Sequence, residues 1–171
     1  DGARGEEAEE RRRQAFARVR DVPLLYKERS QTLYSDLGPI LIGELLERLC
    51  QQRLDEIFRT EVSEPLGLTD AFFVHLQSPL QQQRPTTDFV ATETCAWRQR
   101  LVRGQVHDEN AYLLSGVAGH AGLFATLGAV EYLAQTLLAA TAGQSSFLRA
   151  DTLDLFTRRQ NLVADSSRAL G

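Results

Sequence analysis

The sequence predicts a chain of helices with a few short strands, and three kinds of pattern carry that prediction. Leucines at four-residue intervals over residues 37–49 are typical of a helix with one apolar face. A charged stretch over residues 5–20, with a modest apolar stripe, predicts another long helix, and residues 127–142 predict a third. By contrast, residues 89–94 and 100–102 are short runs that predict strands.

The other elements of the first half follow from proline and capping patterns. Residues 22–26 form a short extended segment, because the residue before a proline avoids the helical region. Ser35 or Asp36 is expected to cap the leucine-bearing helix, and Pro39 lies in its first turn, where a missing N–H costs nothing. A second helix is predicted over residues 53–62.

The second half of the chain is expected to be less regular until its last helices. Residues 77–85 are polar and contain three consecutive glutamines and two prolines, which predicts an exposed loop. Residues 116–124 are rich in small side chains and suit close packing of backbone segments. Thr126 is expected to cap the next helix and Gly143 to end it, and a last short helix is predicted over residues 149–158.

Composition and charge argue against a nucleic-acid partner and a membrane span. The net charge is −4 and the isoelectric point is about 5.4, whereas nucleic-acid binding needs a basic face. The one basic run, residues 11–13, follows four glutamates, so it is predicted to be a solvated helix face with Glu7–Arg11 and Glu9–Arg13 pairs. No apolar run approaches the roughly 18 residues that a membrane-spanning helix needs.

The chain is expected to be a central piece of a longer protein. It contains no methionine, not even an initiator, and it stops at residues 168–171 without a terminal helix cap or polar tail. Cys50 and Cys95 are far apart and have no metal-type neighbours. Both are predicted to be buried free thiols.

Four landmarks in a fixed order resemble one family of serine hydrolases. Tyr34-Ser35-Asp36 is followed by an apolar helix and then by the Glu-Pro-Leu-Gly-Leu turn of residues 64–68. The stretches 104–111 and 116–126 come next. Together they are similar to the second motif and the later landmarks of the serine β-lactamase, penicillin-binding-protein and esterase superfamily, over roughly residues 20–171.

This resemblance implies a fold, a reaction and a set of roles. The fold would be mixed α/β (α+β) and β-lactamase/transpeptidase-like, of which residues 1–171 would supply mostly the helical part and its connecting loops. The reaction would be acyl transfer through an acyl-serine, on a small ester, amide or β-lactam, with no cofactor. Tyr34 would be the acid/base group and Asp36 the positioning group. Ser35, His107 and Asn110 would lie on the substrate side.

The family's lysine-bearing motifs are absent from this chain. Lys27 is its only lysine, and Leu24 stands three residues before it, so there is no Ser-x-x-Lys and no Lys-Thr-Gly. His120-Ala121-Gly122 fits the letters of the third motif, His-x-Gly, but we expect the true third motif to come later than this glycine-rich stretch. The chain by itself is therefore predicted to be inactive and, with apolar helix faces left uncovered, marginally stable.

Two alternatives to the hydrolase hypothesis follow from the same residues. The chain could be a non-catalytic binding or scaffold module that keeps the helical half of the fold. A metal site could combine residues 107–109 with His75 or His120, but no tight spacing such as His-x-x-x-His is present, and we predict none. We interpret His120 as structural and Trp97 as a packing residue.

Overall fold

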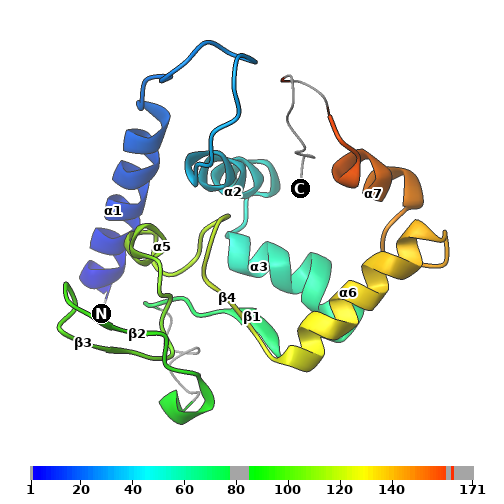
Figure 1. Cartoon of the computed structure of the whole chain (residues 1–171). Coiled ribbons are helices and arrows are strands. Elements are labelled where there is room, and N and C mark those ends of the chain that lie inside the picture. Colours follow the sequence, from blue (N-terminus) through cyan, green and yellow to red (C-terminus); the bar gives the residue numbers. More distant parts are fainter. Residues whose placement is uncertain (1, 78–84, 161–162, 164–171) are drawn as a thin grey trace. The chain divides into compact units, whose positions relative to one another are not determined.

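The computed structural model describes residues 2–77, 85–160 and 163 of the chain (Figure 1). The chain divides into two units. The first comprises Asp1–Val22 and Asp36–Phe124, and the second comprises Pro23–Ser35 and Ala125–Gly171. The exposed loop predicted over residues 77–85 lies almost wholly outside the described residues.

Helices make up most of the first unit, as predicted. The long ones are α1 (Gly2–Arg20) and α2 (Leu37–Cys50). The predicted helix over residues 53–62 is present as α3 (Leu54–Phe58), which continues through a π-helical turn, η1 (Arg59–Ser63), into α4 (Glu64–Leu66). Two further short helices lie among the described residues of this unit, the 3₁₀ turn η3 (Thr86–Asp88) and α5 (Glu109–Leu113). The sequence patterns did not predict α5, because five residues show too little periodicity.

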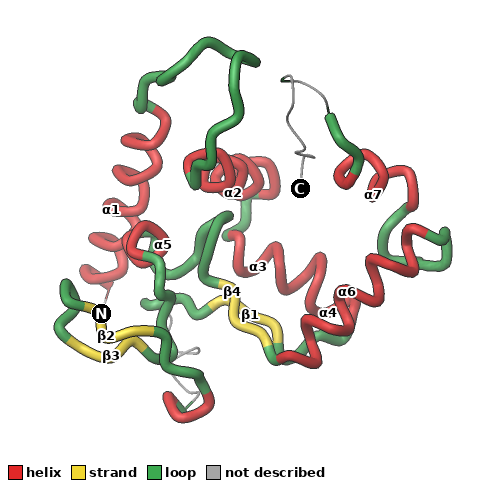
Figure 2. Tube along the Cα trace, in the orientation of Figure 1, coloured by secondary structure: helices red, strands yellow, loops and turns green. Residues whose placement is uncertain are grey.

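The described strands form two small sheets (Figure 2). β2 (Glu93–Cys95) and β3 (Arg100–Val102) form an antiparallel hairpin, with Glu93 opposite Val102. The strand predicted over residues 100–102 is confirmed, whereas the one predicted over residues 89–94 begins later, at Glu93. β1 (Ala71–Phe73) pairs with β4 (Leu123–Ala125), and neither strand was predicted as such. Phe89 packs edge-on against Phe124, with ring centroids 5.1 Å apart, at the end of this second pair.

The second unit contains α6 (Leu127–Thr141) and α7 (Ala150–Thr157), close to their predicted bounds. The side chain of Thr126 accepts a hydrogen bond from the backbone N–H of Ala129 at 3.2 Å, which confirms the predicted cap. Gly143 follows the helix with a φ of +69°. A glycine adopts this left-handed conformation without a side-chain clash, so it ends the helix as predicted.

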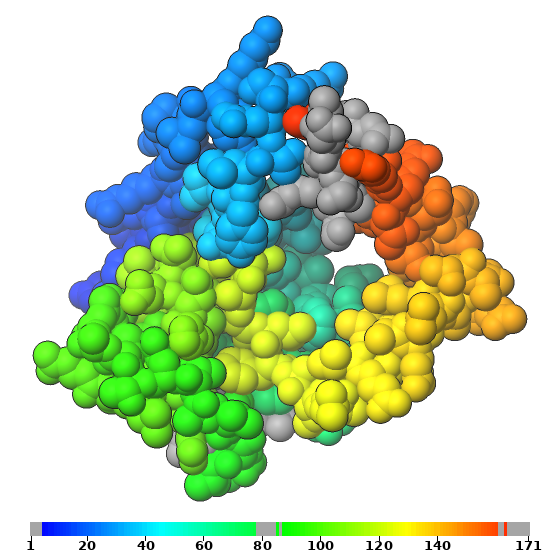
Figure 3. All heavy atoms as spheres, in the orientation of Figure 1, coloured from blue at the N-terminus to red at the C-terminus, as the bar shows by residue number. Residues whose placement is uncertain are grey.

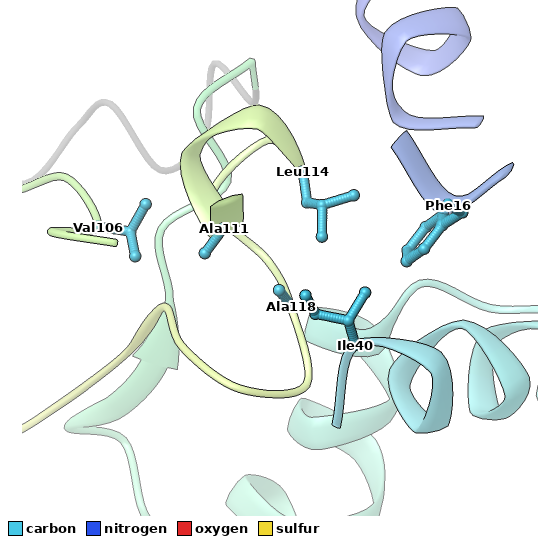
Figure 4. Packing of buried hydrophobic residues seen from close by; sticks show 6 residues of the cluster. All are labelled: Phe16, Ile40, Val106, Ala111, Leu114 and Ala118. Atoms are coloured by element: carbon cyan, nitrogen blue, oxygen red, sulfur yellow. The ribbon is translucent and has the colours of Figure 1, made fainter. Parts of the chain in front are cut away.

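The core of the first unit joins α1, α2 and α5 to the glycine-rich loop after α5 (Figure 4). Its buried members come from these segments and from the stretch that precedes α5: Phe16, Ile40, Val106, Ala111, Leu114 and Ala118. Figure 4 shows these side chains pointing toward one another. Asp36, Asn110 and His120 lie on or directly beside these segments, so packing of this core fixes their separations.

The buried face of α2 is not the leucine stripe that the periodicity indicated. Ile40 and Glu44 are buried, at 2% and 7% exposure, whereas Leu45 and Leu49 are 53% and 71% exposed. Charge pairing explains the difference. The carboxylate of Glu44 accepts hydrogen bonds from Arg20 of α1 and from Arg48, so its burial is compensated. The leucine face remains open on this unit, in line with the expected uncovered apolar faces.

Arg12 is not part of a solvated helix face, contrary to the prediction for residues 11–13. Its side chain is 5% exposed and forms an ion pair with Glu47, Nη2 to Oε1, of 2.6 Å. Arg13 is solvated as predicted, although its partner is Glu10 at i−3. Periodicity could not separate the two arginines, because the partner of Arg12 lies on another helix.

Two further predictions have opposite outcomes at the cysteines. Cys95 is a buried free thiol, as expected, but Cys50 is exposed. Cys50 is the last residue of α2, and the chain turns away through the left-handed Gln51, so nothing packs over the thiol.

Trp97 packs edge-on against Tyr112 with ring centroids 5.3 Å apart, which agrees with its interpretation as a packing residue. Among the described residues, no helix is long and apolar enough to cross a membrane.

Candidate active site

The Tyr34-Ser35-Asp36 motif crosses the boundary between the two units. Tyr34 and Ser35 end the irregular segment of the second unit, and Asp36 begins the first. Tyr34 is 76% exposed. The geometry of the candidate site is therefore described from Asp36, together with the groups that surround it in the first unit.

Asp36 occupies the N-cap position of α2 but does not cap it with its side chain. Its backbone carbonyl accepts from the N–H of Ile40 at 3.0 Å, which starts the helix. Its carboxylate makes no cap hydrogen bond, contrary to the sequence prediction. The backbone explains this result, because Asp36 has helical torsion angles (φ −80°, ψ −14°) instead of the extended ones that aim a capping side chain at the first turn. The carboxylate is thus available for other contacts.

Asp108 does cap its helix. Oδ1 of Asp108 accepts from the backbone N–H of Ala111 at 2.7 Å, at the start of α5. The same oxygen lies 2.8 Å from Nε2 of His120. The His120 side chain is 5% exposed, so this contact is shielded from water. The contact between His120 and Asp108 thereby links the loop after α5 to the N-cap residue of α5.

Glycines allow the loop that carries His120 to lie directly on the first turns of α2. A Cβ atom on Gly119 would lie 2.1 Å from the carbonyl oxygen of Pro39, and one on Gly43 would lie 3.1 Å from the amide nitrogen of Gly119. No larger residue fits at Gly119 without displacing the backbone. In the space-filling view, the start of α2 and the yellow-green loop after α5 lie side by side (Figure 3). The predicted close packing of residues 116–124 is confirmed.

These two arrangements bring Asp36, Asp108 and His120 together. One carboxylate oxygen or ring nitrogen from each residue lies within 4.8 Å of those of the other two. Partial burial acts to raise the pKa of Asp108, but donation from Ala111 and the contact with His120 outweigh it, so the pKa lies below its ordinary value. Asp108 is therefore ionised at neutral pH and holds the ring of His120 through a charge-assisted contact.

Asp36 also opens onto a groove beside this cluster. The groove has a volume of about 490 Å³ and is lined by α1, the start of α2 and α5. Asn110 lines it, as does Asp36, so two of the predicted site residues share one cavity. Arg11 and Arg18 of α1 also line the groove and form no ion pair with any residue that the structure describes. The groove thus offers cationic groups, an amide and a carboxylate.

His107 lies outside this groove. Its side chain is 55% exposed, and its Nε2 lies 3.8 Å from Oε2 of Glu93 on the hairpin. Its backbone carbonyl accepts from Arg98 at 3.0 Å. Of the residues proposed from sequence, the first unit therefore groups Asp36 with Asn110, while His107 lies on the hairpin side of α5.

Sequence reasoning set aside the two residues that lie nearest to Asp36. Asp108 was considered only as part of residues 107–109, and His120 was interpreted as structural. An aspartate three residues before Ala111, at the start of a short helix, is a local capping signal. No local signal places either residue beside Asp36, because the contact joins segments more than 70 residues apart in the chain.

Comparison with solved structures places the fold in the β-lactamase/transpeptidase class. The chain superimposes on the octameric penicillin-binding-protein homologue from Pyrococcus abyssi with a TM-score of 0.59 and 15% identity, over 85% of the chain and 30% of the homologue. At this identity the likeness concerns the fold. The helical content with small sheets agrees with the α+β class predicted from sequence.

The chain belongs to the Beta-lactamase family, a family of serine hydrolases, whose model matches residues 1–170. A protein of Escherichia coli (strain K12) named D-alanyl-D-alanine carboxypeptidase is 33% identical over 157 residues, covering 84% of this chain and 35% of the relative. The N-acetylmuramyl-L-alanine amidase of Bacillus subtilis (strain 168) is 32% identical over 163 residues, covering 88% and 36%. The chain thus spans about a third of the length of these relatives.

Proposed function

We propose that the chain is the helical part of a serine hydrolase that cleaves a small ester, amide or β-lactam through an acyl-serine intermediate. Family membership and relatives named as a carboxypeptidase and an amidase support this class of reaction. In this proposal Tyr34 is the acid/base group and Asp36 positions the reacting groups. Ser35, His107 and Asn110 contribute on the substrate side.

The observation that carries the proposal is the state of Asp36. The side chain of an aspartate at an N-cap usually accepts a hydrogen bond from a backbone N–H of the first turn of the helix. Here the carboxylate makes no cap bond and instead faces Asp108 and His120 and lines the groove shared with Asn110. A carboxylate that contributes nothing to the cap, but that lies at a cavity, suits a role in binding or catalysis.

To act as a base, Tyr34 needs a nearby cation that stabilises its phenolate, and the chain contains no lysine-bearing family motif that could provide one. A tyrosine has a pKa near 10, so acting as a base at neutral pH requires about 4 kcal/mol of differential stabilisation of the phenolate, at roughly 1.4 kcal/mol per pKa unit. The chain's one lysine, Lys27, is not part of a Ser-x-x-Lys. The proposal therefore assigns the nucleophilic serine, its lysine and the third motif to parts of the protein outside residues 1–171.

The test uses active-site probes on two forms of the protein. The 171-residue chain should show no stoichiometric labelling by a fluorophosphonate or a fluorescent penicillin. The parent protein should be labelled on a serine in a Ser-x-x-Lys, and Tyr34→Phe should slow that acylation by about 10²-fold or more, the range typical of general acid–base catalysis. Tyr26→Phe, in the same irregular segment, is the matched control and should leave the rate unchanged. A labelled serine within the chain would contradict the proposal.

A second candidate is a non-catalytic binding module, which the missing lysine motifs favour. Its groove would then be the functional feature, with Arg11 and Arg18 available to bind an anionic group. The same labelling experiment separates the two candidates. A parent protein that binds substrate analogues but is never acylated would favour the binding module.

A further inference from the structure

We propose that Asp36, Asp108 and His120 bind a divalent transition-metal ion of the Zn²⁺ type. The site consists of the residue that begins α2, the residue that caps α5, and a residue of the glycine-rich loop. Their ligand atoms all lie within 4.8 Å of one another. Asp36 is also the positioning group of the proposed hydrolase, but the metal proposal rests on the grouping of the three residues within the first unit and not on hydrolase activity.

The donor set and its spacing suit such an ion. Three protein ligands drawn from imidazole and carboxylate, with a remaining position for water, are typical of open zinc sites. Bonds of about 2.1 Å at tetrahedral angles separate two ligand atoms by about 3.4 Å. The separation between His120 and Asp108 is 2.8 Å, and the other separations do not exceed 4.8 Å, so the cluster is of the right size for one ion. Small side-chain rotations would complete the coordination.

His120 provides an observation that is independent of the two carboxylates. Its side chain is only 5% exposed and is aimed at the cluster through Nε2. Its other ring nitrogen, Nδ1, is buried and has no hydrogen-bond partner among the residues that the structure describes. Buried polar atoms are normally satisfied, and an unsatisfied one costs about 1–3 kcal/mol. A buried imidazole with spare bonding capacity beside two carboxylates is suited to metal ligation.

Nε2 is the ring nitrogen of His120 that faces the carboxylates, so we assign it as the ligand atom, with His120 and Asp108 both coordinating the ion directly. The neutral ring and the ionised Asp108 are the forms that metal binding requires.

The two carboxylates are also free to take part. Oδ1 of Asp108 accepts from Ala111 and contacts His120, and the carboxylate also interacts with the backbone N–H of Asn110. A carboxylate has about four lone-pair sites, so Asp108 can bind an ion in addition. Asp36 makes no side-chain hydrogen bond or ion pair with them. Because Asp108 is held by a backbone N–H, its orientation is fixed in advance, which lowers the cost of ordering the site.

The test is calorimetric titration of the chain with ZnCl₂ in a Cys50→Ser background, since the exposed thiol of Cys50 is a competing ligand. One ion should bind per chain. Asp36→Asn and His120→Ala should each weaken the affinity by at least about tenfold, since even the loss of an orienting partner costs about 10–100-fold. Asp70→Asn and His107→Asn, at exposed positions outside the cluster, are the matched controls and should bind as the background chain does.

A second measurement guards against loss of structure in His120→Ala. In the unsubstituted chain, substoichiometric Mn²⁺ should broaden the NMR ring signals of His120 and spare those of His107. Absence of Zn²⁺ binding, full affinity in Asp36→Asn, or broadening at His107 instead of His120 would each overturn the proposal. None of these results bears on Tyr34 or on acylation of the parent protein, so the two proposals can fail separately.

Discussion

Arg12 of α1 donates from Nη1 to the backbone carbonyl of Val117 at 2.9 Å and from Nη2 to Oε1 of Glu47 at 2.6 Å. It also donates to the carbonyl of Leu114. One guanidinium therefore joins α1, α2 and the loop that carries His120. A buried charge is tolerated when it is paired and hydrogen-bonded, as this one is. Arg12 thus helps to hold His120 at its distance from Asp36.

Replacing Arg12 should destabilise the first unit strongly. In Arg12→Met, the partly buried Glu47 loses its partner and two backbone carbonyls lose their donor. Removal of one member of a buried pair costs about 3–5 kcal/mol, and we expect a loss of about 3 kcal/mol in the free energy of unfolding. Urea denaturation followed by circular dichroism measures it. Arg13→Met, whose side chain is 68% exposed, should cost less than about 1 kcal/mol. Equal losses of unfolding free energy in the two variants would show that the buried contacts of Arg12 do not stabilise the unit.

The contact between the glycine-rich loop and α2 can be tested at Gly119. In Gly119→Ala the added Cβ would meet the carbonyl of Pro39 at 2.1 Å, so the loop must move away from the helix. Overpacking of this kind costs about 1–3 kcal/mol, and we expect a loss near the upper end, measured as a shift of the thermal midpoint. Gly38→Ala is the control, because nothing lies within 4 Å of its Cβ position. Because Ala is a better helix former than Gly, the control should lose no stability. An equal loss in the control would show that the contact with Pro39 is not the cause.

What the sequence could predict was local. The extent of α2, the Thr126 cap and the strand β3 follow from patterns within a few residues of each element. β1 and β4 were missed because each has three residues and they pair across about 50 positions of the chain. Short strands of this kind are determined by tertiary packing.

The same limit applies to the candidate site. The Tyr-Ser-Asp motif identified Asp36, but its neighbours Asp108 and His120 come from distant segments. The buried face of α2 was also assigned wrongly, because Arg12 and Arg20 on another helix compensate the burial of Glu47 and Glu44. A periodicity argument treats glutamate as polar and exposed, and it cannot include a partner that lies elsewhere.

Two aspartates that begin helices should respond differently to removal. Asp108→Ala loses a cap bond to Ala111 and the partner of His120, and should cost about 1–2 kcal/mol. Asp36→Ala loses no cap bond, so only the interaction of its charge with the helix dipole remains, which is about 0.5 kcal/mol. Chemical denaturation of both variants under identical conditions gives the comparison. A larger loss for Asp36→Ala would mean that its carboxylate stabilises α2 after all.

Stability should fall as the pH decreases through the range set by His75. Burial first, and then the positive charge of Arg53, lower the pKa of His75 from 6.5 to about 4. Between these two values the unfolded chain binds a proton at this residue and the folded chain does not, so unfolding is favoured as the pH falls. The contribution of His75 to stability is therefore fully present above about pH 6.5 and is lost progressively toward pH 4.

We expect the urea midpoint of the chain to decrease as the pH falls over this interval, and to decrease less in His75→Asn. His107→Asn, at an exposed position, should follow the unsubstituted chain. If His75→Asn shows the same pH dependence as the unsubstituted chain, another group must be responsible for the acid instability.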